Sequence, residues 1–422
     1  ILCFLSKEGK AYFQSESTDS ITTASLIKRI SDTIVIKNVN PAIPLSLGFN
    51  LKLGSKNNRL AFVLKNEDTL QSEAIVELTN PFLDLIKLYT YNSEKVTDSI
   101  ICGAMYIYKY RLRNHPNFQF LIKLLPGQTL TCLMNIDVGN VSGDFKFMAW
   151  NRQSRNEFKL TETKYLDYFF IINISFLLLI GIAIFITKQR FHWYYFVYAL
   201  FGFIYIYTEV GLGFKNLWPK HPYFHSISIL FIANIYQIFG LLFIKRYFNT
   251  EARFPMLDRI LVSLVYAGIL FELTIFGFAS FQSTIPLWFV KSNTIIFILS
   301  GLIVFSTAVF SIRIKNLKSD SIWFIIGFSP HAFSILQLCL RPFALYNTTD
   351  ELWFKQIAPI YIDTIHPPNL LLWAVLWESI IVFLLIIKRL RILYEENIRM
   401  TRQLALQRER NMQTLLTGVE NE

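Results

Sequence analysis

Seven apolar segments of about twenty residues each, separated by short loops, dominate the chain between Tyr168 and Ile387. The hydrocarbon core of a bilayer is about 30 Å thick, and about 20 apolar residues of helix cross it. Lipid offers no partner to a free backbone amide, so each segment must be helical. The pattern predicts a seven-helix transmembrane domain over residues 163–387. The predicted segments are 168–187, 192–214, 223–244, 260–280, 287–312, 321–339 and 369–387.

Residues 36–162 carry a different pattern, in which apolar and polar positions alternate over four or five residues. Leu60–Leu64, Ala74–Leu78 and Phe118–Ile122 are such stretches, and turn formers such as Pro126–Gly127 separate them. Alternation with a period of two is typical of half-buried strands, and no helical period persists here. We therefore expect an all-β sandwich or barrel.

Residues 1–35 form a polar lead-in to this domain. Its opening, Ile1–Ser6, has two interpretations: the end of the apolar region of a signal peptide, or a first strand or frayed end.

Residues 388–422 are polar and contain neither Gly nor Pro until Gly418. Apolar side chains recur at spacings of four and three, with Asn397 in one slot of the same series. The apolar positions are Ile386, Leu390, Leu393, Met400 and Leu404. This pattern predicts a coiled coil in which a buried Asn397 sets the register of a parallel homodimer. A solvated single helix is the alternative.

Composition and charge favour a membrane protein over a soluble one. The chain is 53% hydrophobic and contains 39 Phe. Its net charge of +11 would suit nucleic acid, but the Lys and Arg residues lie largely in short loops beside apolar segments, so we expect membrane lipid and no nucleic acid as a partner. The loops after the first, third, fifth and seventh segments are the most basic. This bias places the β domain outside the cell and the C-terminus in the cytoplasm.

Ionisable side chains at membrane depth are expensive, so each requires a reason. The sequence places six in or near the spans: Glu209, Glu272, Lys291, His331, Arg341 and Glu378. We expect Glu209 to pair with Lys291 or Arg341 near the outer ends of their helices. We expect Glu378 to hydrogen-bond within the bundle, with His331 as the candidate partner. The alternative is that each side chain reaches the membrane surface or satisfies a neighbouring helix.

An aromatic and basic run in the β domain is a candidate ligand-binding face. Its residues, together with one Trp, are Tyr106, Tyr108, Tyr110, Arg111, Arg113 and Trp150. Aromatic planes and guanidinium groups suit sugar stacking or anion binding. The alternative is that these aromatic side chains belong to the core or rim of the sandwich.

The sequence contains no nucleophile motif, no phosphate-binding loop and no metal-spaced cluster of Cys or His. It therefore predicts no catalytic residue, no metal and no cofactor, and it leaves open whether the chain is part of an enzyme. Cys102 and Cys132 lie in the same predicted domain, where either a disulfide or two free thiols would be compatible with the sequence.

Two regions resemble the bacterial seven-transmembrane receptors with diverse intracellular signalling modules (7TM-DISM). Asn80–Tyr89, then Gly103, then Tyr106–Arg113 follow the order of the second type of extracellular domain in that family. Leu200–Pro219 resembles the second helix and first outer loop of the same receptors. Glu378 followed by a basic exit from the last segment resembles their last helix.

The resemblance implies a jelly-roll sensor domain similar to carbohydrate-binding modules, a multi-pass protein in the bacterial inner membrane, and a small extracytoplasmic ligand, with a carbohydrate as one option. It also implies an output domain after residue 422. Leu415–Glu422 is similar to the approach to the phosphoacceptor helix of one histidine-kinase class, whose partner would be a cytoplasmic response regulator. A cyclase, phosphatase or DNA-binding output is an alternative. A transporter or channel with an outer binding domain is the rival function.

Overall fold

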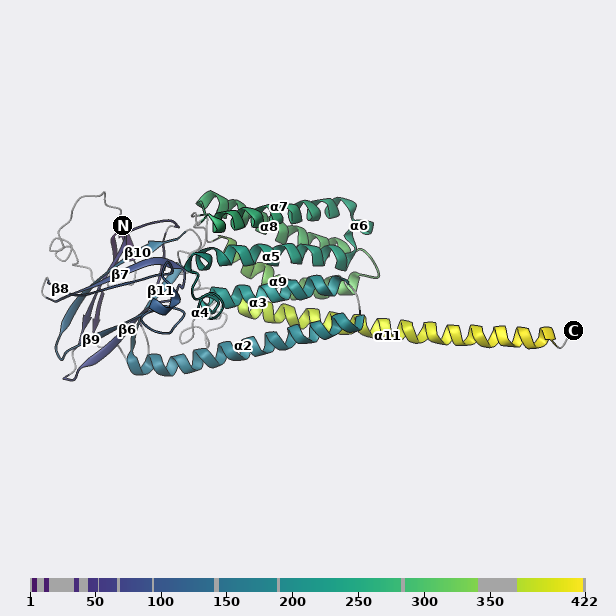
Figure 1. Cartoon of the computed structure of the whole chain (residues 1–422), viewed down its shortest axis with the longest axis horizontal. Helices are drawn as coiled ribbons and strands as arrows, with labels where there is room; N and C mark the ends of the chain where they lie inside the picture. Colours follow the sequence, from purple (N-terminus) through teal and green to yellow (C-terminus); the bar gives the residue numbers. More distant parts are fainter. Residues whose placement is uncertain are drawn as a thin grey trace.

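The structure is a computed structural model that places a β domain at one end of a helical bundle. One helix continues far beyond the opposite end of the bundle (Figure 1). The residues described are 2–5, 11–14, 34–37, 45–51, 53–66, 69–92, 95–139, 144–187, 190–281, 285–340 and 370–419.

The β domain is a sandwich of two sheets. The larger sheet has the order β2-β1-β5-β10-β7-β8, with β3 also paired to β5, and the smaller has the order β4-β11-β6-β9. The strands are β1 (Leu2–Leu5), β2 (Ala11–Gln14), β3 (Ile34–Lys37), β4 (Leu45–Asn50), β5 (Asn58–Lys65), β6 (Ser72–Leu78), β7 (Leu83–Asn92), β8 (Lys95–Cys102), β9 (Phe118–Leu124), β10 (Thr129–Val138) and β11 (Asp144–Asn151). Phe62, Phe120 and Phe147 fill the space between the sheets.

The alternating stretches all lie in strands, but the pattern missed β2, β4 and β8; β1 is the first strand that was one of the interpretations of Ile1–Ser6. β8 is largely exposed, so it lacks the apolar alternation that a buried face produces. β4 was also missed. β1 and β2 lie within the expected lead-in, where β1 pairs antiparallel with β2 and parallel with β5. The described residues of the lead-in are thus β1, β2 and the start of β3, all in the larger sheet.

Cys102 and Cys132 are free thiols, so a disulfide between them is wrong. They lie on β8 and β10, and β7 pairs with both strands and separates them. Both side chains are buried in the core, and burial raises the pKa of each thiol to about 12. Each therefore packs as a small, unreactive apolar residue.

The bundle contains seven helices of 20 residues or more within the described part of the chain. They are α2 (Arg152–Thr187), α3 (Arg190–Glu209), α5 (Pro222–Phe248), α7 (Pro255–Ser280), α8 (Leu287–Ser311), α9 (Lys318–Leu340) and α11 (Leu370–Val419). The short helices α4 (Leu212–Asn216) and α6 (Thr250–Arg253) connect them.

Five of these long helices are long and apolar enough to cross a membrane. The spans are Leu166–Ile186, Pro222–Phe248, Pro255–Ser280, Leu287–Ser311 and Leu371–Asn411. On the described residues, α3 and α9 do not reach the same apolarity, although both pack in the bundle beside the others (Figure 1). Seven membrane crossings therefore stay a prediction.

The first long helix begins earlier in the chain than the sequence suggested, with no loop between it and the last strand. We expected the β domain to reach residue 162 and a helix to begin at Tyr168, but β11 ends at Asn151 and α2 begins at Arg152. The polar first turns of α2 hid the helix from a search for apolar segments. A strand of the sandwich thus continues directly into the first long helix of the bundle.

A close backbone contact at Gly103 gives a test of this fold. A Cβ there would lie 2.1 Å from the carbonyl oxygen of Asp84, and its φ of +157° is unfavourable for other residues. We expect Gly103→Ala to lower the free energy of unfolding by about 3 kcal/mol. Thermal unfolding in nanodiscs, followed by circular dichroism, measures the loss.

Gly127→Ala is the matched control, because Gly127 has φ +68° but nothing within 4 Å of an added Cβ. Its cost should be only the backbone strain of about 1 kcal/mol. Equal losses in the two variants would contradict the close contact at Gly103.

Candidate functional site

A buried ion pair joins the smaller sheet to the first turn of α2. The Arg155 guanidinium donates from Nε to Glu77 Oε2 at 2.7 Å and from Nη2 to Glu77 Oε1 at 3.2 Å. Asn117 Nδ2 also donates to Glu77 at 2.8 Å, and His115 Nε2 lies 2.9 Å from Arg155 Nη2. Neither member of the ion pair is more than 2% exposed. Such a bidentate, buried pair fixes the angle at which α2 leaves the sheet.

A second contact, the outer joint, fastens the β domain to the outer end of α5. We define it by Pro81, Phe82, Arg111, Phe214 and His225. The His225 ring is fully buried and stacks on Phe82 at 4.4 Å and on Phe214 at 4.2 Å between centroids. Its Nε2 lies 3.1 Å from the carbonyl oxygen of Pro81. Two ring stackings and one hydrogen bond of His225 therefore hold the β domain against α5.

Arg111 closes the outer joint from the β domain. Its Nη2 donates to the Pro81 carbonyl at 3.1 Å, and its Nη1 donates to the carbonyl of Pro116. The guanidinium lies over the rings of Phe118 at 4.2 Å and Tyr108 at 5.1 Å. Burial lowers the pKa of Arg111 to about 10, so the side chain stays charged at neutral pH. Arg111 is therefore a structural cation at the joint.

The six residues of the expected ligand face do not form one open face. Tyr108 and Arg111 come together at the outer joint, and burial raises the pKa of Tyr108 to about 12. Trp150 is 2% exposed and packs against Phe158. Tyr106 and Tyr110 are exposed, and Arg113 is half-buried. Trp150 thus packs as a buried aromatic side chain, as the alternative interpretation expected.

Four polar side chains meet in the middle of the bundle, one from each of α3, α5, α9 and α11. We call Tyr198, Tyr236, His331 and Glu378 the buried tetrad. The Tyr236 hydroxyl donates to the Tyr198 hydroxyl at 2.7 Å, and Tyr198 donates to Glu378 Oε2 at 3.1 Å. His331 Nε2 hydrogen-bonds to Tyr236, and its Nδ1 lies 2.6 Å from Glu378 Oε2. The structure thus brings Glu378 and His331 together.

The contact between His331 and Glu378 brings a ring nitrogen and a carboxyl oxygen to 2.6 Å from each other in the interior of the bundle. Because all four side chains are buried, losing one partner would leave the others without compensation in an apolar setting.

Helices α9 and α11 also make two close contacts near the tetrad, at Ile326 and Gly327 of α9. Pro330 has no N–H, so the carbonyl of Ile326 has no intrahelical donor from that position. The indole of Trp377 on α11 donates to this carbonyl at 3.0 Å. A Cβ on Gly327 would lie 2.7 Å from the side chain of Ile381, so glycine permits the close approach. These contacts set one register between the two helices.

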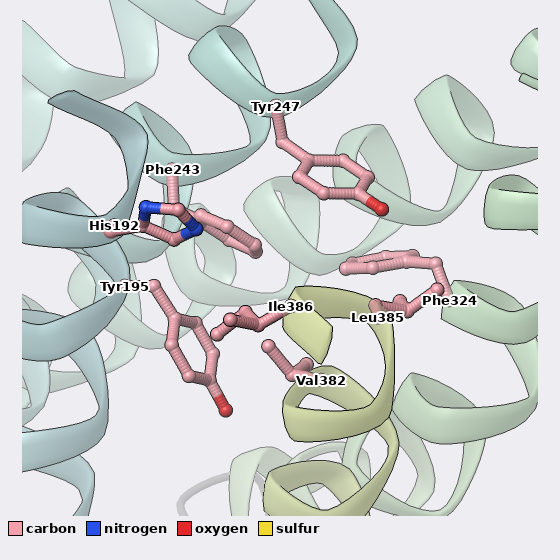
Figure 2. A pocket seen from close by; sticks show the side chains of 8 residues that line it. All are labelled: His192, Tyr195, Phe243, Tyr247, Phe324, Val382, Leu385 and Ile386. Atoms are coloured by element: carbon pink, nitrogen blue, oxygen red, sulfur yellow. The ribbon is translucent and has the colours of Figure 1, made fainter. Parts of the chain in front are cut away.

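A small apolar cavity lies between four helices of the bundle, and Figure 2 shows the side chains that line it. Its lining comes from α3, α5, α9 and α11 and consists of His192, Tyr195, Phe243, Tyr247, Phe324, Val382, Leu385 and Ile386. Its volume of about 10 Å³ leaves room for at most one water molecule. The cavity is therefore too small for an organic ligand.

The other predicted membrane residues lie outside the tetrad. Glu209 ends α3, and Lys291 lies in the second turn of α8; both are partly buried. Arg341 lies outside the described residues, so the pairing expected of Glu209 stays a prediction. Glu272 is partly buried in α7, a helix that contributes no member of the tetrad. Among the described residues, no group of three or more His, Cys, Asp or Glu could hold a metal ion.

Sequence reasoning missed Tyr198, Tyr236, Glu77, Arg155 and His225. Tyrosines are common in apolar segments, so nothing marked the two members of the tetrad. Glu77 did carry a signal in the sequence, because it is the one charged residue in the otherwise apolar stretch Ala74–Leu78. All five residues of that stretch are buried in β6. Its partner could not be inferred, since Arg155 is 78 residues away.

The Glu77–Arg155 pair predicts that removing the charge of Glu77 lowers the stability of the protein strongly. Glu77→Gln leaves a buried guanidinium without its counter-ion and should lower the free energy of unfolding by about 3–5 kcal/mol. Glu73→Gln is the control on the same strand, because Glu73 pairs with Arg152, which is 58% exposed. That change should cost less than about 1 kcal/mol. Similar losses in urea unfolding of the two variants would contradict the structural role of Arg155.

The tetrad predicts coupling between two helices. A double-mutant cycle of Glu378→Gln and His331→Gln, measured by thermal unfolding in nanodiscs, should give a coupling energy of about 1–3 kcal/mol. The reason is that the two buried side chains lie 2.6 Å apart, so a change in either alters the surroundings of the other. The control cycle pairs His331→Gln with Glu272→Gln and should be additive within about 0.5 kcal/mol. Additivity in both cycles would contradict the tetrad.

Comparison with known proteins finds two family matches. The family described as 7TM diverse intracellular signalling matches residues 163–362, and the family described as 7TMR-DISM extracellular 2 matches residues 44–141. No curated protein matches the chain. Among solved structures, the pre-peptidase C-terminal domain of collagenase from Bacillus anthracis is 9% identical, with a TM-score of 0.18, covering 28% of this chain and 94% of that one.

The two family matches fall on the two parts of the structure. One covers most of the sandwich from β4 to β10, and the other begins within α2 and covers the bundle through α9. Together they account for well over half of the chain, and they belong to one kind of receptor. The chain belongs to the family of transmembrane receptors with diverse intracellular signalling modules, 7TM-DISM.

Proposed function

We propose that the chain senses an extracytoplasmic ligand through its β domain and transmits the signal across the bacterial inner membrane to a cytoplasmic output. The observation that carries this proposal is α11. One uninterrupted helix of 50 residues contributes Glu378 to the buried tetrad and then leaves the bundle as an exposed shaft (Figure 1). A change in the tetrad can therefore move the shaft.

The input side has two mechanical links to the bundle. The Glu77–Arg155 pair orients α2, and the outer joint holds α5 through His225. A ligand that binds two arrangements of the β domain unequally would bias both links. Helices α3 and α5 carry the two tyrosines of the tetrad, so a shift of α5 reaches Glu378 through Tyr236 and Tyr198.

The positions of the two ends support the proposed orientation, with the β domain outside and the end of α11 in the cytoplasm. The β domain and the free part of α11 lie at opposite ends of the bundle (Figure 1). Basic side chains gather where α11 leaves it, and there Lys388 pairs with Asp320 of α9 at 2.7 Å. An excess of Lys and Arg is typical of the cytoplasmic side. An odd number of crossings places these two ends on opposite sides, and the proposed number is seven, with α3 and α9 included.

The output is proposed to be a histidine kinase that transfers phosphate to a response regulator. The support is the resemblance of residues 415–422 to the approach to a phosphoacceptor helix. A carbohydrate is the ligand class proposed for the β domain, because the family fold is similar to carbohydrate-binding modules. The proposed link from the β domain to α11 depends neither on the kind of output nor on the class of ligand.

The rival function is a transporter or channel with an outer binding domain. It requires a polar path through the bundle. In the described part of the bundle, the tetrad side chains bond to one another, and the cavity beside them is small and apolar. α9 also continues through Pro330 rather than breaking there. These features favour the receptor.

The shaft predicts a parallel dimer. Met400 and Leu404 are 54% and 60% exposed on the single chain, and a partner helix would cover both. In membranes, Leu404→Cys in the full-length protein should form a disulfide-linked dimer under mild oxidation. Arg402→Cys, an exposed position on the opposite face of the same turn, should not.

Asn397 would lie in the same seam and set its register, which Asn397→Cys tests in the same gel assay. Equal cross-linking at positions 402 and 404, or none at either, would contradict the dimeric shaft. Sugar or ion flux into vesicles that contain the protein would favour the rival function.

A further inference from the structure

A short segment between β8 and β9 exposes an unusual number of apolar side chains. We call residues 105–112 the anchor loop. Its exposed apolar side chains are Met105, Tyr106, Ile107, Tyr110 and Leu112, with exposed fractions between 37% and 67%. A continuous patch of this kind on a water-exposed domain indicates an interaction surface.

The anchor loop lies at the level of the outer ends of the helices. The Tyr108 backbone N–H donates to the carbonyl of Pro219 at 3.0 Å, and the Tyr108 ring packs edge-on against Phe214 at 5.5 Å. Pro219 precedes the first residue of α5, Pro222, by three positions. The side of the loop that holds Tyr108 and Arg111 therefore contacts the bundle, whereas the five apolar side chains of the loop are exposed.

The chemistry of this region fits the boundary between lipid and water. Tyr and Trp side chains favour that boundary, and basic side chains are attracted to anionic headgroups. Lys109 and Arg113 flank the exposed aromatic side chains, and Lys215 and Lys220 lie in the neighbouring connection between α3 and α5. Leu217 of that connection is also 54% exposed, so the apolar and basic patch continues onto the bundle.

We propose that the anchor loop inserts its apolar side chains into the headgroup region of an anionic outer leaflet and so holds the β domain against the membrane. Apolar side chains of such elements bury about 5–10 Å into this region. On the other side of the same loop, Tyr108 bonds to Pro219 and Arg111 lies over the Phe214 ring at 5.4 Å, so the loop would lie between lipid and the outer joint. The proposal depends on the bundle crossing a bilayer, but on neither the ligand nor the output.

The test compares two exposed leucines at opposite ends of the β domain. Leu112 lies in the anchor loop, whereas Leu125 follows β9 and is 59% exposed. β9 begins at Phe118, beside the outer joint, and its seven residues span about 20 Å. Leu112→Cys and Leu125→Cys are each labelled with an environment-sensitive nitrobenzoxadiazole dye in the full chain, in phosphatidylglycerol nanodiscs.

We expect brominated lipid to quench the label at position 112 several-fold more strongly than the label at position 125, with the dye-treated wild type as the blank. Aqueous iodide should show the reverse order. Replacing phosphatidylglycerol by phosphatidylcholine should weaken the quenching at position 112. Equal quenching at both positions would overturn the proposal, as would a label at position 112 that is shielded from iodide but unaffected by bromine. Quenching that is insensitive to the headgroup would overturn the preference for anionic lipid.

Discussion

A carboxyl group in the middle of an apolar bundle must find hydrogen-bond partners, and this constraint fixes the position of α11. Glu378 is 4% exposed and reaches Tyr198 and His331, which lie on different helices. Moving α11 along or around its axis would take the carboxyl group away from both. The favourable arrangements of α11 are therefore few and discrete, which is the property that a two-state transmitter needs.

The same reasoning explains how an event in the β domain can reach this helix. β11 runs directly into α2, and the buried Glu77–Arg155 pair stiffens the connection. His225 holds the start of α5, whose middle carries Tyr236. α9 and α11 share a register set by the indole of Trp377, which replaces the donor that Pro330 lacks. A series of packed and hydrogen-bonded elements thus leads from the sheet to the shaft.

The sequence predicted what depends on local pattern and on the cost of burial. Alternation located the strands with a buried face, apolar length located the helices, and the expense of a charge in lipid singled out Glu378 and His331. It could not predict partners that only the tertiary arrangement brings together, such as Tyr198 and Tyr236. The same limit explains why Arg111 was assigned to a ligand face and lies instead in a joint, and why a disulfide was considered for two cysteines that β7 separates.

The most direct test of this account is the position of α11 relative to the rest of the bundle. Spin labels at Arg246→Cys, on the exposed end of α5, and at Arg391→Cys, just beyond the bundle on α11, report one distance in nanodiscs. The account predicts a narrow distance distribution in the otherwise wild-type protein and a shifted or broadened one when Glu378→Gln is added. Superimposable distributions would contradict the claim that the buried carboxyl group sets the position of the shaft.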